Sequence, residues 1–303
     1  MEFPKISTTT LLDQLTPPTG KVHMVLDTDT FNEIDDQFAV VQAILSPDSL
    51  DLKAIYATPF HNKNSDSAGD GMEKSYGEIL RLLERLNVSP EGFVFKGATQ
   101  FLSSRQQPEA SPATDHLIDL ALKIDGVLYV VAVGAITNVA SAILLEPQII
   151  EKIVVIWLGG QPPYYRNSRE FNLGQDLLSS QLTFDCGVPL VQIPCQGVAS
   201  HLQTTVAEIE RYVEGQGDIG DYLAQIFKAY HADHFGWSKV IWDISAVAYL
   251  INPSWIETEL VHSPILTDQI TWSFDNNRHF MRLATYVHRD PIFRDLFRKL
   301  DSI

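Results

Sequence analysis

The chain is poor in cysteine and in basic residues. Of its 303 residues only Cys186 and Cys195 are cysteines, and 22 Lys and Arg stand against 38 Asp and Glu, a net charge of −16. Two cysteines in no metal or redox spacing exclude a disulfide framework and favour a reducing, cytoplasmic location. The acidic excess disfavours a protein that binds nucleic-acid backbones or anionic lipid, so we expect neither nucleic acid nor a membrane as a partner.

Long hydrophobic runs are scarce as well. Asp13 and Gln14 interrupt the only leucine cluster near the N-terminus, which argues against a signal peptide. Residues 126–145 carry no charge over about twenty positions, the length of a membrane span. Glycine and polar residues interrupt this segment: Gly134, Thr137, Asn138 and Ser141. We therefore interpret it as a buried strand followed by a turn and a helix.

Short apolar runs rich in β-branched residues alternate with helical patterns. The runs are continuous, as in parallel strands covered on both faces. They lie at 22–26, 52–58, 93–95, 128–133, 153–158 and 190–193. Helical patterns lie between them at 35–45, 73–86, 113–123, 137–145 and 176–185. The alternation predicts an α/β fold with an open, mostly parallel sheet and helices on both faces.

The last third of the chain changes character. Helical patterns fall near 205–214, 219–232, 243–251 and 290–300, and strand-like runs at 256–262, 268–274 and 280–287. No linker, repeat or low-complexity segment divides the sequence. We expect residues 1–303 to form a single domain with a C-terminal elaboration, preceded by an N-terminal extension of roughly 1–20.

An aspartate-rich segment, LDTDTFNEIDDQF, follows the first expected strand. It places five acids within ten residues: Asp27, Asp29, Glu33, Asp35 and Asp36. One such acid could simply favour a helix start. Five acids repel one another unless a cation or protons compensate them, and their oxygens suit Ca²⁺ or Mg²⁺. Because sites in open α/β sheets form at the carboxyl ends of strands, the segment indicates a metal or catalytic site.

This segment resembles the N-terminal signature of nucleoside hydrolases, with two extra residues in the middle and without the family's Gly. Three later segments resemble that family's motifs in the same order: VAVGAITNVASAIL, the Glu-Phe-Asn of 170–172, and KVIWDISAVAYL. Haloacid-dehalogenase-like phosphatases also carry Asp-x-Asp after their first strand. However, Phe31 departs from that motif, and their downstream Lys and Asp motifs have no convincing match.

The resemblance implies a Ca²⁺-dependent hydrolase that cleaves the N-glycosidic bond of a ribonucleoside into ribose and free base. The implied metal ligands are Asp29, Asp36, Asp243 and the main-chain carbonyl of Val133, with Asp29 also the general base. In general terms, a bound metal ion orients a water and lowers its pKa, and a carboxylate then takes the proton.

The resemblance also implies residues that hold the sugar. Ribose contacts are implied for Asp35, Glu170 and Asn172, with Asn62 a weaker candidate and Asp27 supporting the turn. Glu170 and Asn172 lie two apart, so an extended backbone would face both the same way, toward vicinal hydroxyls. Tyr164 stands where the family has an Asn, and Asn167 is the candidate substitute.

Help for the leaving base is the open part of the mechanism. Many family members have a His before the last Asp, whereas this chain has Trp242, as purine-preferring members do. An indole delivers no proton but stacks on a purine, which favours a purine nucleoside. His61, His231 and His234 remain candidates from flanking loops.

Two alternatives stay open. The Tyr164 departure allows another N-ribosyl or sugar substrate, and the missing His allows a weakly catalytic, metal-dependent sugar-binding protein. Nucleoside hydrolases commonly form dimers or tetramers, so the resemblance implies a homo-oligomer.

Overall fold

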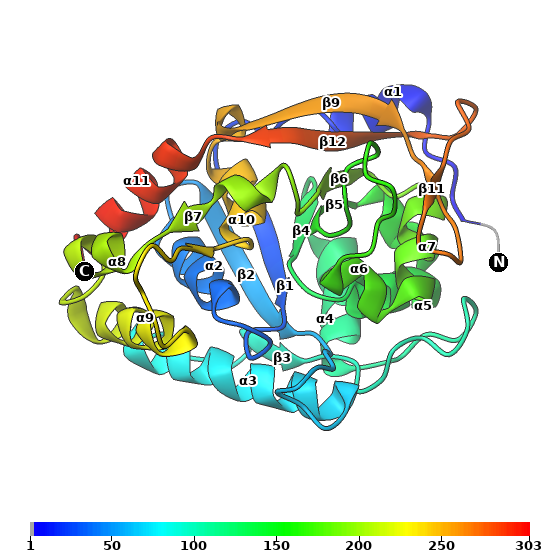
Figure 1. The fold of residues 1–303 in the computed structure, drawn as a ribbon. Helices are drawn as coiled ribbons and strands as arrows, with labels where there is room; N and C mark the ends of the chain where they lie inside the picture. Colours follow the sequence, from blue (N-terminus) through cyan, green and yellow to red (C-terminus); the bar gives the residue numbers. More distant parts are fainter. Residues whose placement is uncertain (1–2) are drawn as a thin grey trace.

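The computed structural model describes residues 3–303 and is built around a sheet of eight strands (Figure 1). The strand order is β3-β2-β1-β4-β5-β6-β12-β9. All neighbouring pairs are parallel except β12 and β9, which are antiparallel. The strands are β1 Val22–Thr28, β2 Leu50–Ala57, β3 Val94–Lys96, β4 Leu128–Ala132, β5 Ile153–Leu158, β6 Leu190–Ile193, β9 Ile256–His262 and β12 Phe280–Val287.

Eleven α-helices surround this sheet within residues 3–303. They are α1 Thr8–Gln14, α2 Asp35–Ile44, α3 Ala68–Arg85, α4 Pro112–Lys123, α5 Thr137–Leu145, α6 Phe171–Gln175, α7 Leu177–Asp185, α8 Val206–Tyr212, α9 Gly217–Tyr230, α10 Ile244–Ile251 and α11 Arg289–Leu300. Four two-residue strands form two small ladders: β7 Gln203–Thr204 with β8 Lys239–Val240, and β10 Ile265–Leu266 with β11 Trp272–Ser273. Over the same residues, none of the helices combines the length and apolar character that crossing a bilayer requires.

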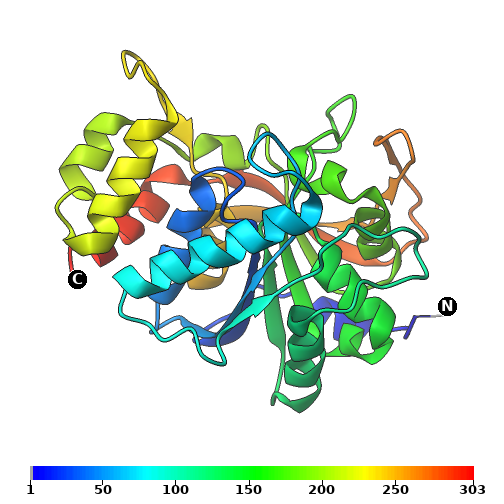
Figure 2. The same cartoon turned by 90° about the horizontal axis from the view of Figure 1, so that it is seen from below.

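Successive residues of the parallel strands alternate between two hydrophobic cores. On β1, for example, Met24 and Leu26 join one core and Val25 joins the other. Helices α2, α3 and α10 contribute to the first core, and α4, α5 and α7 to the second, on opposite faces of the sheet (Figures 1 and 2). The predicted fold class is therefore confirmed, and burial on both faces explains why the strands have continuous apolar runs.

The C-terminal part extends the sheet and fills one end of the molecule. Strand β12 adds parallel to β6, and β9 closes that edge. Helices α8, α9 and α11 gather at the opposite end from α5 and α7 (Figure 1). The N-terminal extension contains a helix that the sequence analysis did not predict. In this extension Leu11 and Leu15 are buried, and the Arg282 guanidinium of β12 donates to the Leu15 carbonyl.

Two local predictions were wrong. The run 268–274 is not one strand, because Ile270 turns the chain with a positive φ of 59° and only Trp272–Ser273 is extended in β11. Helix α3 begins at Ala68, five residues before its expected start. Its first turn needs glycine, since a Cβ on Gly71 would lie 2.0 Å from the carbonyl oxygen of Phe60.

The strand order places a binding crevice beside β1. Strands 3-2-1-4-5-6 run outward in both directions from β1, so the chain reverses its winding between β1 and β4. In open α/β sheets this switch point is where the carboxyl ends of two strands leave room for a ligand. Asp27, at the end of β1, is in register with Ala132 of β4 and Tyr56 of β2. The aspartate-rich segment therefore emerges at the switch point.

The junction between α6 and α7 is fixed by a buried carboxylate. Asp176 accepts hydrogen bonds from the Leu102 amide at 3.0 Å, the Thr137 hydroxyl at 2.8 Å, and both the amide and hydroxyl of Ser179. It thereby caps α7 and ties the junction to α5 and to the loop after β3. Because α6 borders the switch point, this bonding sets the position of one wall of the crevice.

We expect Asp176→Ala to lower the free energy of unfolding by about 2–4 kcal/mol, since it leaves buried donors on Leu102 and Thr137 unpaired. Urea unfolding followed by circular dichroism measures this. Asp119→Ala is the matched control, because Asp119 forms only an exposed ion pair with Lys123, and we expect no measurable change. Equal stability of the two variants would contradict a structural role for Asp176.

Candidate active site

A cavity of about 450 Å³ opens at the carboxyl ends of the central strands. Most of the predicted site residues line it: Asp35, Asp36, Asn62, Val133, Glu170, Asn172, Trp242 and Asp243. Asp27 and Asp29 are fully buried and are not part of its surface. A larger cleft of about 600 Å³ between α8 and α11 contains none of the predicted residues. The sequence motifs therefore converge on the cavity at the switch point.

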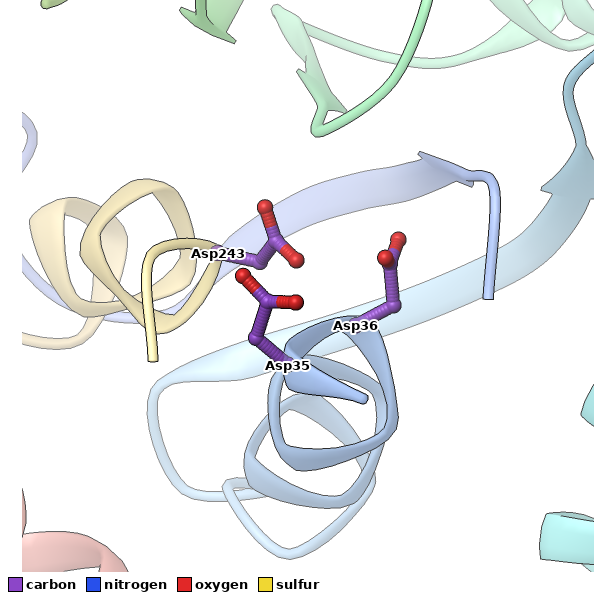
Figure 3. Close-up of side chains that lie close together, drawn as sticks. All are labelled: Asp35, Asp36 and Asp243. Atoms are coloured by element: carbon purple, nitrogen blue, oxygen red, sulfur yellow. The ribbon is translucent and has the colours of Figure 1, made fainter. Parts of the chain in front are cut away.

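Three aspartates from two helix starts face one another in this cavity (Figure 3). Asp35 and Asp36 begin α2, and Asp243 immediately precedes α10. One carboxylate oxygen from each lies within 4.8 Å of the others, and all three residues are buried. Asp243 makes no capping hydrogen bond to α10, so helix capping does not account for its carboxylate. The arrangement is that of oxygen ligands around a hard cation.

Asp29 is buried without any compensating contact. Among the described residues, neither of its carboxylate oxygens has a hydrogen-bond partner. Gly134 allows this close packing, because a Cβ there would lie 3.0 Å from the Asp29 carboxyl carbon and 2.5 Å from the Thr58 methyl. A buried carboxylate without a partner is costly, and a divalent cation would satisfy it. The residues present therefore fit a metal ion at this place.

Burial and mutual repulsion disfavour the ionised forms of these acids. Burial raises the pKa of Asp27 to about 7 even though Asn138 donates to its carboxylate at 2.7 Å. Burial, together with the charge of Asp35, raises the pKa of Asp36 to about 7. Burial and the neighbouring carboxylates raise the pKa of Asp29 and of Asp243 well above the usual range. A cation bound among these groups would favour their ionised forms instead.

Backbone and hydroxyl donors orient the carboxylates that line the cavity. Asp36 accepts from the Thr28 hydroxyl and from the Asp29 amide at 3.1 Å. Asp35 accepts from the Trp242 amide at 3.2 Å, which joins the start of α2 to the segment before α10. The first and last motifs of the sequence are thus hydrogen-bonded directly, although 207 residues separate the two partners.

The sequence analysis assumed that the Glu-Phe-Asn segment is extended. In the structure this segment instead forms the start of α6. Glu170 caps that helix and accepts from the amides of Gly160, Asn172 and Leu173 at 2.8–3.0 Å. The Asn172 amide nitrogen donates to the carbonyls of Val133 at 3.2 Å and Leu158 at 3.0 Å. Both side chains line the cavity. The Asn172 oxygen remains available to a ligand because its nitrogen is already bonded. The Glu170 carboxylate is held in place by its three backbone donors.

Other predicted residues are placed differently. The Asn62 side chain donates to the Asn32 side-chain oxygen at 2.6 Å and accepts from the Asn64 backbone amide at 2.7 Å. It thereby links two loops at the rim. Asn167 does not line the cavity, and its oxygen accepts from the Arg169 amide. Tyr164 is 74% exposed. Asn167 therefore does not substitute for a sugar-binding Asn in this structure.

No histidine lines the cavity within residues 3–303. His61 is exposed. His231 stacks on Trp237 at 5.3 Å between ring centres, and the His234 ring bonds the Lys228 carbonyl. None of the three lines the cavity in this structure, whereas Trp242, the residue before Asp243, does.

Sequence reasoning missed two residues beside the acids. The Lys239 ammonium is buried, 2.5 Å from a Glu33 oxygen and 3.8 Å from an Asp35 oxygen. Burial alone would lower the pKa of Lys239, but Asp35 and Glu33 raise it above its usual value. Cys195 follows β6 and lines the cavity, and burial, together with the charge of Glu170, raises the pKa of its thiol. Its place after a strand end was the signal that could have identified it.

The family model described as inosine-uridine preferring nucleoside hydrolase matches residues 24–290. A putative pyrimidine-specific ribonucleoside hydrolase RihB of Shigella boydii serotype 4 is 28% identical over 165 residues, covering 52% of this chain and 68% of that relative. The pyrimidine-specific ribonucleoside hydrolase RihB of Shigella flexneri serotype 5b is 27% identical over 175 residues, covering 56% of this chain and 54% of that relative. The match thus spans about half to two thirds of these relatives' length.

Among solved structures, the purine-preferring ribonucleoside hydrolase from Gardnerella vaginalis superposes with a TM-score of 0.74 at 19% identity, over 92% of this chain and 98% of that one. This likeness shows the fold. The family model spans most of the sequence, and its motifs meet in one acidic cavity. The chain belongs to the inosine-uridine preferring nucleoside hydrolase family, whose members are hydrolases of N-glycosyl bonds.

Proposed function

We propose that this protein hydrolyses the N-glycosidic bond of a ribonucleoside, with Ca²⁺ as its cofactor, and releases ribose and free base. The observation that carries the proposal is Asp29, whose buried carboxylate has no partner beside the converging acids of the cavity. The cavity volume of about 450 Å³ lies in the range of small-molecule sites. Family membership supports the reaction class.

Asp29, Asp36, Asp243 and the Val133 carbonyl would hold the ion. Asp35 belongs to the same cluster, but its oxygens already face the Trp242 amide and Lys239, so we assign it to the ribose. An ion held there would orient a water and lower its pKa. Asp29, whose oxygens have no hydrogen-bond partner among the described residues, would take the proton of that water as the water attacks the sugar.

The ribose would be held from the opposite wall. Asn172 donates both amide hydrogens to carbonyls of β4 and β5 ends, so its oxygen is left to accept from a hydroxyl. Glu170 is immobilised by three backbone donors and offers the remaining lone pairs of its carboxylate. Such fixed acceptors bind hydroxyls without having to reorganise, which is what holding a strained sugar requires.

For the base we propose a purine, on the strength of Trp242. Its half-buried indole borders the cavity beside Asp243 and supplies a stacking face, and no described histidine lines the cavity to supply a proton. Stacking favours a large base whose departure is helped by protonation from solvent. The Shigella relatives carry the description pyrimidine-specific, so the preference has to be tested with both base classes.

A panel of purine and pyrimidine ribonucleosides, with and without a calcium chelator, tests the function. We expect base release from inosine or another purine riboside, and loss of that release together with a lower Tm after chelation. Turnover of a different N-ribosyl compound alone would favour that substrate class. Binding of ribose and Ca²⁺ without turnover of any compound would favour the sugar-binding alternative.

Replacing the proposed base separates catalysis from folding. We expect Asp29→Asn to lower kcat by about 10²–10⁴. The same variant should raise the Tm of the chelated protein, because it removes a buried charge that nothing compensates. Steady-state kinetics and thermal unfolding measure the two effects. Asp48→Asn, on an exposed loop, is the matched control with neither effect expected. An unchanged kcat would show that Asp29 is not the base.

Trp242→Ala tests base stacking. The loss of an aromatic stacking face costs about 1–3 kcal/mol per base, so kcat/KM for inosine should fall about 5- to 150-fold. The value for uridine should fall less, and Trp242→Phe should retain most of the purine activity. Rates for both nucleosides with all three proteins provide the comparison. Equal losses on inosine and uridine would mean that Trp242 only packs against the site.

A further inference from the structure

Lys239 is a buried cation that lies directly behind the acids of the cavity wall. Its side chain is only 8% exposed, and its ammonium contacts Glu33 at 2.5 Å and lies 3.8 Å from Asp35. Asp35 in turn stands within the cluster that includes Asp36 and Asp243. A lysine ammonium is rarely buried to this extent unless carboxylates surround it, so its position depends on the acids it faces.

Three separate elements hold this ammonium in place. Lys239 is the first residue of β8, which pairs with β7, and its ammonium donates to the Val240 carbonyl at 3.2 Å. The Lys239 ammonium lies over the ring of Tyr230, at the end of α9, 4.9 Å from the ring centre. Glu33, in the loop between β1 and α2, completes the surroundings. Lys239 therefore does not swing freely, and its charge acts on the cluster from a fixed place.

Lys239 is not part of the cavity surface but contacts two acids that are, Glu33 and Asp35. Among the described residues, Lys63 is the only lysine or arginine that lines the cavity; its side chain is exposed and forms no ion pair with the acids. Water screens an exposed charge strongly and a buried one weakly. The interior of the site therefore holds one effective positive charge against Asp35 and its neighbours.

We propose that Lys239 is a positioning residue that serves as a resident counter-cation: it holds Glu33 and Asp35 in place and limits how tightly the site binds a divalent ion. This rests on the proposed metal site. Two effects of opposite sign follow. Without metal, the positive charge stabilises the folded site because it offsets the repulsion among the acids. With metal, the same charge repels the incoming cation and weakens its binding.

The test is calcium titration of the chelator-treated full chain by calorimetry, with thermal unfolding in chelator and in excess Ca²⁺. For Lys239→Met we expect a lower Tm in chelator. We also expect the dissociation constant for Ca²⁺ to fall by up to about tenfold, since a nearby buried positive charge is removed. Lys239→Arg keeps the charge and should bind Ca²⁺ like the wild type. Lys63→Met, at the exposed rim, should change the dissociation constant less than about twofold.

The outcomes separate this inference from the proposed function. If the wild type binds no Ca²⁺, the proposed metal site fails and this inference falls with it. If the wild type binds Ca²⁺ but Lys239→Met binds it equally or more weakly, the proposed function stands and the counter-cation role is wrong. Should Lys239→Met fold only with Ca²⁺ present, the role is supported. Should it not fold at all, Lys239→Gln, which keeps a donor toward Glu33, is judged by the same dissociation constant.

Discussion

Repulsion among carboxylates buried at the end of β1 is the constraint that the surrounding structure answers. Asp27, Asp29 and Asp36 are each removed from water within a few residues of one another, and Asp243 joins them from α10. The fold compensates them only in part. Asn138 donates to Asp27, and Thr28 and a backbone amide donate to Asp36, but Asp29 receives nothing. This incomplete compensation makes the site receptive to a cation, because a fully hydrogen-bonded cluster would gain little from one.

Much of this site could be predicted because the physics that builds an open parallel sheet also places its ligands. Apolar runs identify strands buried on both faces, and the carboxyl ends of such strands meet at one edge. Asp36, Val133 and Asp243 were expected at strand or helix boundaries of that edge, and all three line one cavity. The direction of the backbone alone predicted a site at the aspartate-rich segment, and the resemblance to nucleoside hydrolases added Val133 and Asp243 to it.

The features that sequence reasoning missed depend on particular contacts, of which some join distant segments and others are local. Lys239 looks like an ordinary surface lysine in a two-residue strand until Glu33 and Tyr230 are seen around it. Asn167 had a suitable side chain, but a local bond to the Arg169 amide turns it away from the cavity. Glu170 and Asn172 were expected to face the same way on an extended backbone. That expectation was wrong because Glu170 caps a short helix instead. Only the surroundings of Lys239 require a contact between distant segments, whereas the other two depend on which of several local hydrogen bonds forms.

One hydrogen bond joins the proposed parts of the site. The Trp242 amide donates to Asp35, so the residue proposed to stack on the base is hydrogen-bonded directly to the residue proposed to hold the ribose. Asp35 also faces Lys239, and Trp242 is followed directly by Asp243. A change in the loop before α10 would therefore alter base stacking, sugar binding and the metal ligands together. If the proposed roles hold, we expect substrate preference to be coupled to the acidic cluster, since a different base would have to be accommodated without moving the start of α10.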